Sequence, residues 1–333
     1  MAAMTFWKNK QVLVTGGAGF LGSHVVSLLK ETEAAEIRIP RSGTNDLTIR
    51  ENCRDAVHGI DIVIHLAARV GGIAFNQEKP GDIVRDNLLM GVQLMEEARL
   101  AGVTKYVTVG TTCCYPVNTP IPFHEDDLWN GYPEEITAPY GIAKRMLLVQ
   151  GQAYRRQYNF NAIFLLPVNL YGPGDHFNTE YSHVIPALIK KTVDAKNTGE
   201  KQVTVWGTGK ATREFLYVED AALGIVLAAE KYDRAAPVNL GSGIETPIKS
   251  VVKLIAEIAG YNGEIVWDTS RPDGQPRRSV DTSRARQAFG FVAKTSLREG
   301  LTRTIEWYLE HAAGLDNPTG KYRHPERETS GQR

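Results

Sequence analysis

Cysteine is scarce in this chain, with only Cys53, Cys113 and Cys114 among 333 residues. Three cysteines are too few and too irregularly spaced to form a disulfide framework, and they contain no CxxC pair of the kind that binds zinc. We therefore expect reduced thiols, which are typical of a cytoplasmic protein.

Long apolar runs and an excess of one charge are also missing. No run approaches the roughly 20 apolar residues that span a bilayer, and residues 1–10 lack the basic start and apolar centre of a signal peptide. The 38 basic and 38 acidic residues cancel, so nothing favours broad attraction to nucleic acid or to membranes. We expect neither as a partner, and any anion site must be local.

What the chain does contain is a regular alternation of β-rich and helical segments, which is typical of a parallel sheet in the α/β class. Strands are expected at 11–15, 36–39, 60–66, 105–110 and 162–166, with helices at 20–30, 48–58, 87–101 and 140–158. The predicted fold is a Rossmann-like, doubly wound parallel sheet with a smaller, discontinuous substrate lobe.

After Leu170 the composition changes, and longer loops rich in glycine, proline and asparagine are expected. A helix is expected near 183–196 and a strand near 203–206. Residues 213–231 and 237–241 again read as strand, helix and strand. We assign residues 1–168 and about 213–243 to the dinucleotide-binding domain and residues 169–212 and 244–313 to the lobe. Residues 314–333 are polar and non-periodic, as in a mobile tail.

A glycine-rich turn follows the first expected strand, with Gly16, Gly19 and Gly22 in GxxGxxG spacing. Glycine lets the backbone turn tightly and approach a pyrophosphate, whose charge the N-terminus of the next helix favours. This turn, which includes Phe20 and Leu21, is therefore the predicted cofactor site.

The tip of the second strand reads Arg38-Ile39-Pro40-Arg41, where an NAD-preferring enzyme usually has an acidic residue against the ribose. Arg38 and Arg41 suit a 2′-phosphate instead, so the sequence favours NADP(H), with NAD(H) as the alternative. The predicted adenine and ribose edges of the site are Asp46, Leu47, Ala67 and Ala68.

Tyr140 and Lys144 are four residues apart and hence on one face of a helix. A nearby ammonium favours the phenolate, so we expect a lowered pKa for Tyr140 and proton exchange with a sugar hydroxyl during hydride transfer. Thr111, at the end of an expected strand, can polarise the reacting oxygen.

Cys113 follows Thr111 by two residues, and residues two apart on a strand face the same side. If the strand extends this far, Thr111 and Cys113 face the cleft, whereas Thr112 and Cys114 point into packing. Metal binding by the two cysteines with His183 is disfavoured, because adjacent cysteines diverge and no fourth ligand is evident.

Several motifs together give the chain a resemblance to the extended short-chain dehydrogenase/reductase family. They are TGGAGFLG at the glycine turn, HLAA, GTTCCYP, YGIAK and NLYGP. AARVGGIAFN, SHVIPALIKK, VWGTGKATREFLYVED and RPDGQPRR are similar to those members that epimerise C3 and C5 and reduce C4 of GDP-4-keto-6-deoxymannose to make GDP-L-fucose.

This resemblance implies a role for each matching residue. Thr111, Tyr140 and Lys144 would be the reductase triad, with Cys113 and His183 as the acid and base of epimerisation. It adds Pro167, Asn169, Leu170 and His183 to the cofactor site, and places Asn169, Lys191, Trp206, Arg213 and Arg278 at the GDP-sugar. It also implies a homodimer joined by the helices around 87–101 and 140–158.

Other activities remain open at this point. A nucleotide-sugar 4-epimerase with tightly bound NAD needs the Thr, Tyr and Lys but not Cys113 and His183. A reductase of another GDP-keto-sugar and a 3,5-epimerase without reduction are further alternatives. A non-catalytic NADP(H) sensor is disfavoured because the catalytic side chains are present, and a 4,6-dehydratase because no Asp-Glu pair follows Thr111.

Overall fold

The computed structural model describes residues 6–177, 182–271 and 273–315, with the backbone alone for 312–315. Most of the expected C-terminal tail, from residue 316, lies outside the described residues. The chain divides into two compact units. The first consists of Met1–Leu170, Glu214–Glu245 and Arg277–Lys294, and the second of Tyr171–Arg213, Thr246–Pro276 and Thr295–Arg333.

The first unit is built on a six-stranded sheet in the order β2-β1-β3-β4-β5-β9. All five pairings are parallel; for example, Leu13 pairs with Arg38 on one side and with Val63 on the other. This confirms the predicted α/β class. The strands are β1 (Gln11–Thr15), β2 (Glu36–Arg38), β3 (Ile62–His65), β4 (Lys105–Val109), β5 (Ala162–Pro167) and β9 (Val238–Leu240).

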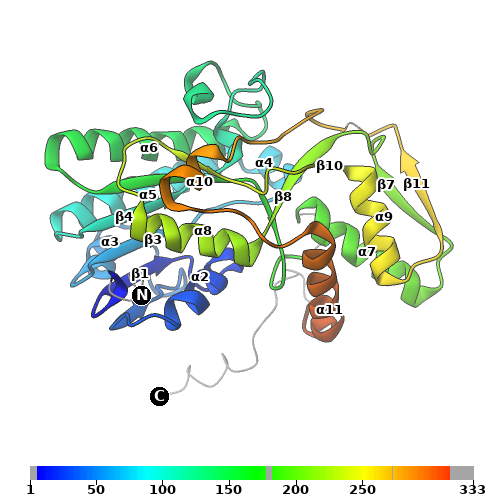
Figure 1. Cartoon of the computed structure of the whole chain (residues 1–333), viewed down its shortest axis with the longest axis horizontal. Helices are drawn as coiled ribbons and strands as arrows, with labels where there is room; N and C mark the ends of the chain where they lie inside the picture. Colours follow the sequence, from blue (N-terminus) through cyan, green and yellow to red (C-terminus); the bar gives the residue numbers. More distant parts are fainter. Residues whose placement is uncertain (1–5, 178–181, 272, 316–333) are drawn as a thin grey trace. The chain divides into compact units, whose positions relative to one another are not determined.

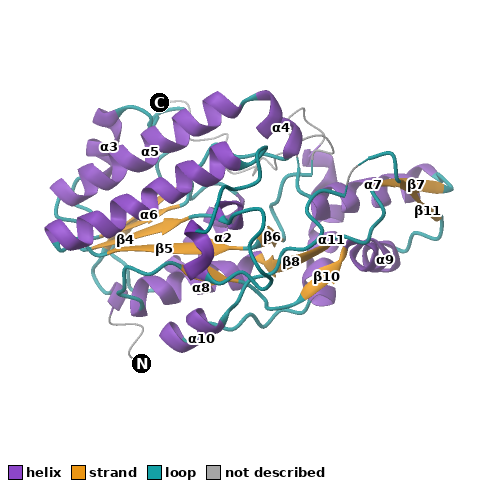
Figure 2. Cartoon of the chain, turned by 90° about the horizontal axis from the view of Figure 1, so that it is seen from above, coloured by secondary structure: helices purple, strands orange, loops and turns teal. Residues whose placement is uncertain are grey.

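Helices cover both faces of this sheet (Figures 1 and 2). On one face α5 packs against both α3 and α6, and on the other α2 packs against α8. Their bounds are α2 (Phe20–Lys30), α3 (Arg50–Val57), α4 (Ile73–Glu78), α5 (Pro80–Leu100), α6 (Ala138–Tyr158), α8 (Val218–Lys231) and α10 (Ser283–Phe289).

The core of the first unit lies between the sheet and these helix layers. Every residue of β3, β4 and β5 is buried, as expected for central strands of a parallel sheet that is covered on both faces. Because β1 and β3 are adjacent, the strand order reverses at their carboxyl ends. Ligands of doubly wound folds bind at such a switch point, and the glycine-rich turn is there.

The second unit contains α7 (Val184–Thr198), β7 (Gln202–Trp206), α9 (Ile248–Ala259), β11 (Glu264–Asp268) and α11 (Leu297–Leu315). Strands β7 and β11 pair in parallel, and α9 packs against both α7 and α11. Three of the five points where the chain passes between units fall at the short strands β6 (Asn169–Tyr171), β8 (Thr212–Tyr217) and β10 (Glu245–Pro247).

Residues 277–294 are where the domain assignment differs from the sequence expectation. We placed them in the lobe, but the structure places them in the first unit. Val280 forms a parallel bridge with Phe123, and Ala285 and Phe289 of α10 join the core of this unit. The bridge between Phe123 and Val280 joins residues more than 100 apart in the sequence, so local patterns could not reveal it.

Several helices were predicted only in part or not at all, among them α9, α10 and α11. Helix α5 begins at Pro80, seven residues before the expected start, with proline in its first turn where no donor is needed. The short helix α4 within residues 67–79 was not expected. It follows Gly71 and Gly72, whose carbonyl oxygens both accept from Asn76 Nδ2.

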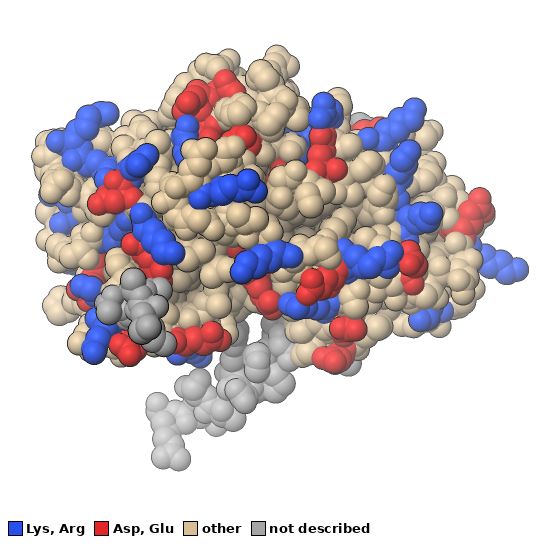
Figure 3. Space-filling model, viewed as in Figure 1, with Lys and Arg blue, Asp and Glu red and all other residues tan. Residues whose placement is uncertain are grey.

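The surface agrees with the balanced composition. On the face drawn in Figure 3, basic and acidic side chains are interspersed and no large area carries one sign. Among the described residues, no helix is both long enough and apolar enough to cross a membrane.

Candidate functional site

The glycine-rich turn connects β1 to α2 in a way that requires glycine at two positions. Gly16 has φ of 70°, and a Cβ there would lie 2.9 Å from the backbone nitrogen of Ala67, just after β3. A Cβ on Gly22 would lie 2.1 Å from the Gly16 carbonyl oxygen. Helix α2 starts at Phe20 with no side-chain cap and no acidic residue in its first turn. The open helix N-terminus and bare backbone fit a dinucleotide pyrophosphate.

The two arginines of the predicted 2′-phosphate site differ in their environment. Arg38 Nη1 donates to the carbonyl oxygens of Ala56 and His58 at the end of α3, at 3.2 and 2.8 Å, and its Nε donates to Glu36. Its guanidinium therefore binds the C-terminal end of α3. Arg41 is exposed in the following loop.

The other predicted cofactor residues lie in the segments that follow β2 and β3. Asp46 Oδ1 accepts hydrogen bonds from the backbone and hydroxyl of Thr48, and Leu47 is buried. The backbone nitrogen of Ala67 donates to the Thr15 hydroxyl, and Ala68 follows it, partly exposed.

The cysteine segment is not a strand, and this part of the sequence argument was wrong. Strand β4 ends at Val109, and residues Thr112–Cys114 form one turn of 3-10 helix. The Thr111 hydroxyl oxygen caps it by accepting from the Cys113 backbone nitrogen at 3.2 Å. The predicted division into buried and exposed side chains is still found, but for a different reason. The turn buries Thr112 and Cys114 and leaves Thr111 and Cys113 partly exposed.

Helix α6 packs directly on this turn. A Cβ on Gly141 would lie 2.2 Å from the Cys113 carbonyl oxygen, and the Cys114 thiol donates to the Gly141 carbonyl oxygen. The buried Arg145 donates from Nε to the Cys114 carbonyl and from Nη1 to that of Gly131. Burial raises the pKa of Cys114 to about 12, which makes it an unreactive thiol.

Tyr140 and Lys144 lie on one face of α6, with Lys144 Nζ 5.9 Å from the centre of the Tyr140 ring. Lys144 is buried, and desolvation lowers its pKa to about 8. The expected lowering of the Tyr140 pKa is not found. Desolvation of the phenol, together with the neighbouring Cys113 and Cys114, raises it above its ordinary value. At neutral pH the Tyr140 hydroxyl is therefore protonated.

Arg278 lies beside the half-exposed cysteine. Its Nη1 is 3.9 Å from Cys113 Sγ, and its Nη2 donates to Glu134 Oε2 at 2.9 Å. The structure thus brings together in the first unit five predicted residues: Thr111, Cys113, Tyr140, Lys144 and Arg278.

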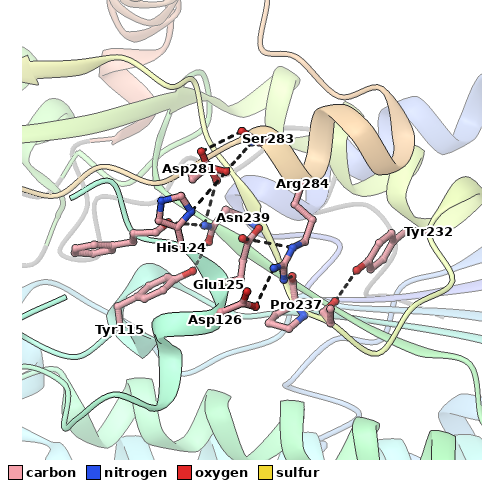
Figure 4. A network of polar contacts seen from close by, with 12 residues as sticks. Tyr115, His124, Glu125, Asp126, Tyr232, Pro237, Asn239, Asp281, Ser283 and Arg284 are labelled. Atoms are coloured by element: carbon pink, nitrogen blue, oxygen red, sulfur yellow. Dashed lines mark hydrogen bonds and ion pairs between the residues drawn. The ribbon is translucent and has the colours of Figure 1, made fainter. Parts of the chain in front are cut away.

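A buried polar network fixes the segments on both sides of this cluster (Figure 4). Asn239, which is fully buried, accepts from the Tyr115 hydroxyl and donates to the carbonyl oxygens of Phe123 and Asp281. The buried Glu125 accepts from the Asn239 backbone and faces Arg284. The loop after Cys114 is thereby tied to the segment that carries Arg278.

Pro167, Asn169 and Leu170 lie at the end of the first of the three segments that make up the first unit. Pro167 closes β5, and Leu170 packs against the core. Asn169 Nδ2 donates to the backbone oxygen of Glu214 at 3.1 Å.

The remaining predicted residues belong to the second unit. His183 is the residue before α7; its side chain is exposed, and desolvation by surrounding protein lowers its pKa. Lys191 Nζ lies 5.6 Å from the centre of the exposed Trp206 ring. Arg213 Nη1 donates to the carbonyl oxygens of Thr212 and Gln275, both at 2.7 Å.

Sequence reasoning missed Glu134, Gly141 and Arg145, the residues that hold the cluster in place. Gly141 lies inside the YGIAK motif and Arg145 directly follows it. Their position beside Tyr140 and Lys144 could have indicated that they contact the same site. Glu134 lies in a loop without a motif, and only the fold shows its contact with Arg278.

Comparison with known proteins agrees with this geometry. Residues 12–241 match the model of the NAD dependent epimerase/dehydratase family. GDP-L-fucose synthase 1 of Arabidopsis thaliana is 37% identical over 306 residues, covering 91% of this chain and 94% of that protein.

Two solved structures are similar in both fold and sequence. A GDP-6-OMe-4-keto-L-xylo-heptose reductase from C. jejuni superposes with a TM-score of 0.85 and 26% identity, over 91% of this chain and 98% of that one. A GDP-L-fucose synthetase from Naegleria fowleri bound to NADP gives 0.83 and 28%, over 92% and 96%. The glycine turn, the Tyr140 and Lys144 pair and these similarities show that the chain belongs to the NAD-dependent epimerase/dehydratase family.

Proposed function

We propose that this protein is an NADPH-dependent 3,5-epimerase and 4-reductase that converts GDP-4-keto-6-deoxymannose to GDP-L-fucose. The observation that carries the proposal is the partly exposed Cys113 beside Tyr140 and Lys144, because epimerisation needs a group that exchanges carbon-bound protons. The names of the relatives, which are GDP-sugar synthases and reductases, support the same substrate class.

The cofactor would be held by the backbone of Gly16, Gly19 and Gly22 and the N-terminus of α2, with Phe20 and Leu21 in its first turn. Bound there, NADPH supplies the hydride. Arg41 is the better candidate for the 2′-phosphate, because Arg38 is engaged with the end of α3. The NADP in the Naegleria fowleri structure supports this choice over NAD.

Reduction of the ketone needs a proton donor at the substrate oxygen. The raised pKa of Tyr140 keeps its hydroxyl protonated at neutral pH, as a donor must be. Lys144, with a pKa of about 8, can return the proton to Tyr140. The Thr111 hydroxyl is available to donate to the same substrate oxygen.

Epimerisation at C3 and C5 exploits the acidity of protons next to the C4 ketone. Cys113 as thiolate would remove the proton while Tyr140 and Thr111 stabilise the enolate oxygen. His183 would act on the opposite ring face, because inversion requires that the proton be returned there. Its lowered pKa keeps the imidazole neutral near pH 7, which is the form that can accept a proton.

The diphosphate and base of the substrate would be bound by Lys191, Arg213, Trp206 and Asn169. Arg213 Nη1 donates to two carbonyl oxygens, which fixes the orientation of a guanidinium whose planar fork suits phosphate. Trp206 is exposed, and Lys191 and Arg271 lie within 5.6 and 5.0 Å of its ring centre. A planar base suits such a ring.

A homodimer and a cytoplasmic location belong to the proposal. On α5 and α6, which lie side by side, Leu89, Val92, Met146 and Val149 are exposed apolar side chains. A paired surface of this kind supports a helical dimer interface, and Val92→Glu should give monomers in sedimentation velocity. The three free thiols support a reducing compartment.

The test is to mix the protein with GDP-4-keto-6-deoxymannose and NADPH. NADPH should be oxidised in proportion to the GDP-L-fucose formed. Conversion of UDP-glucose to UDP-galactose with catalytic bound NAD, without turnover of the keto-sugar, would instead assign a 4-epimerase.

A further inference from the structure

The resemblance implies that Arg278 lies at the GDP-sugar, and the structure places it beside the Cys113 thiol. Its Nη1 points at Cys113 Sγ at 3.9 Å, within hydrogen-bond range for sulfur, and its side chain is only 16% exposed. The same guanidinium is paired through Nη2 with Glu134. One cation therefore bridges a carboxylate and the proposed epimerisation thiol.

We infer that Arg278 is a catalytic residue of the epimerisation half-reaction, which stabilises negative charge on the Cys113 sulfur, and that Glu134 reduces this effect by pairing with the same guanidinium. This inference rests on the proposed function for the identity of the reaction. The step is a proton transfer: the Cys113 sulfur lone pair takes the carbon-bound proton, and the electron pair of the C–H bond moves to the ketone oxygen.

The charges around Cys113 come from three elements. Arg278 and Glu134 lie on two loops, and Tyr140, Lys144 and Arg145 lie on α6. Lys144 and Arg145 have lowered pKa values because of burial, and Arg145 is bound to the Cys114 and Gly131 carbonyl oxygens. Of these cations, Arg278 is the one with a hydrogen-bond contact to Cys113 Sγ among the described residues.

The position of Arg278 is built into the fold. Immediately after it, the Ser279 hydroxyl and the Val280 backbone both donate to Glu214 Oε2, at 2.9 and 2.8 Å. Glu214 is buried, and its other oxygen accepts from Gly243. The Phe123 backbone also donates to the Ser279 carbonyl oxygen. These bonds fix the backbone next to Arg278, and the hydrogen bond to Glu134 holds its guanidinium beside the thiol.

The experiment measures the alkylation rate of Cys113 by iodoacetamide, an uncharged reagent that reacts with the thiolate. Tandem mass spectrometry separates Cys113 from Cys114 by cleavage between them. At pH 7 we expect Arg278→Met to slow the reaction about threefold to tenfold, Arg278→Lys to retain most of the rate, and Glu134→Gln to raise it about threefold. At about pH 10, where an ordinary thiol is ionised, the rates should converge.

Matched controls are Arg286→Met and Glu135→Gln, exposed neighbours of the same charge, which should leave the rate unchanged. An unchanged rate in Arg278→Met at pH 7 overturns the inference. So does a loss that persists at pH 10, because it would report altered access rather than charge. If Arg278→Met fails to fold, Glu134→Gln decides alone, and a rate at or below wild type overturns the inference.

Failure of the proposed function is detected separately. If Cys113→Ser still exchanges deuterium into the keto-sugar, Cys113 is not the epimerisation group, whatever its alkylation rate. If that exchange is lost but the alkylation rates do not depend on Arg278, the function stands and the inference about Arg278 fails.

Discussion

Gly141 and Cys113 are in contact through backbone alone: the Cys113 carbonyl oxygen occupies the space that a Cβ on residue 141 would need, 2.2 Å from its ideal position. The helix that carries Tyr140 and Lys144 is thereby packed against the turn that carries Thr111 and Cys113.

Gly141→Ala should therefore push α6 and the turn apart. We expect a loss of both reduction and epimerisation of at least tenfold, because small displacements of reacting groups are costly, and a destabilisation of about 1–3 kcal/mol. Activity assays and urea unfolding test this. The control is Gly81→Ala in the first turn of α5, where a Cβ meets nothing within 4 Å. If both variants behave like wild type, the close packing does not matter for the site.

Tyr140→Phe removes one hydroxyl and little else. Reduction should fall by about 10²–10⁴-fold through loss of the proton donor. NADPH affinity, measured by fluorescence titration, should change little. Near-normal reduction by this variant would show that the proton comes from another group.

Replacing Arg38 and replacing Arg41 should have different effects, one on stability and the other on NADPH binding. Arg41→Ala should raise the KM for NADPH with little effect on thermal stability, because the side chain is exposed. Arg38→Ala should lower the Tm by weakening the end of α3, because it removes donors to the Ala56 and His58 carbonyl oxygens. The reverse pattern would exchange the two assignments.

This difference shows what the sequence could and could not reveal. The strand-to-helix turn and the Tyr140 and Lys144 pair were predictable, because their spacing along the chain fixes their geometry. The role of Arg38 in packing, the 3-10 turn at Cys113 and the contact of Glu134 with Arg278 depend on tertiary structure. The burial of Cys114 was predicted correctly from a strand that does not exist there.

Asp175 gives a stability prediction. It is 2% exposed, its Oδ2 has no hydrogen-bond partner among the residues that the structure describes, and burial raises its pKa to about 7. Between its unfolded pKa near 4 and pH 7 the folded state binds the extra proton, so stability falls as pH rises through this window. At pH 8 Asp175→Asn should be more stable than wild type, by up to about 4 kcal/mol.

The Asp175→Asn advantage should shrink as pH falls toward 4 and disappear below about pH 3, where both states of the wild type are protonated at this position. Urea unfolding at pH 5 and pH 8, followed by tryptophan fluorescence, measures it. Equal pH slopes for the two proteins would mean that the carboxylate is solvated or paired.

The most direct test of the central claim is deuterium wash-in to C3 and C5 of GDP-4-keto-6-deoxymannose in D₂O without NADPH, followed by NMR. Wild type, Tyr140→Phe and Cys114→Ser should incorporate deuterium at both positions, whereas Cys113→Ser should not. His183→Asn should do so slowly or with altered stereochemistry. If exchange is unchanged in both Cys113→Ser and His183→Asn, neither residue epimerises the sugar, and only a reductase or 4-epimerase built on Thr111, Tyr140 and Lys144 would remain.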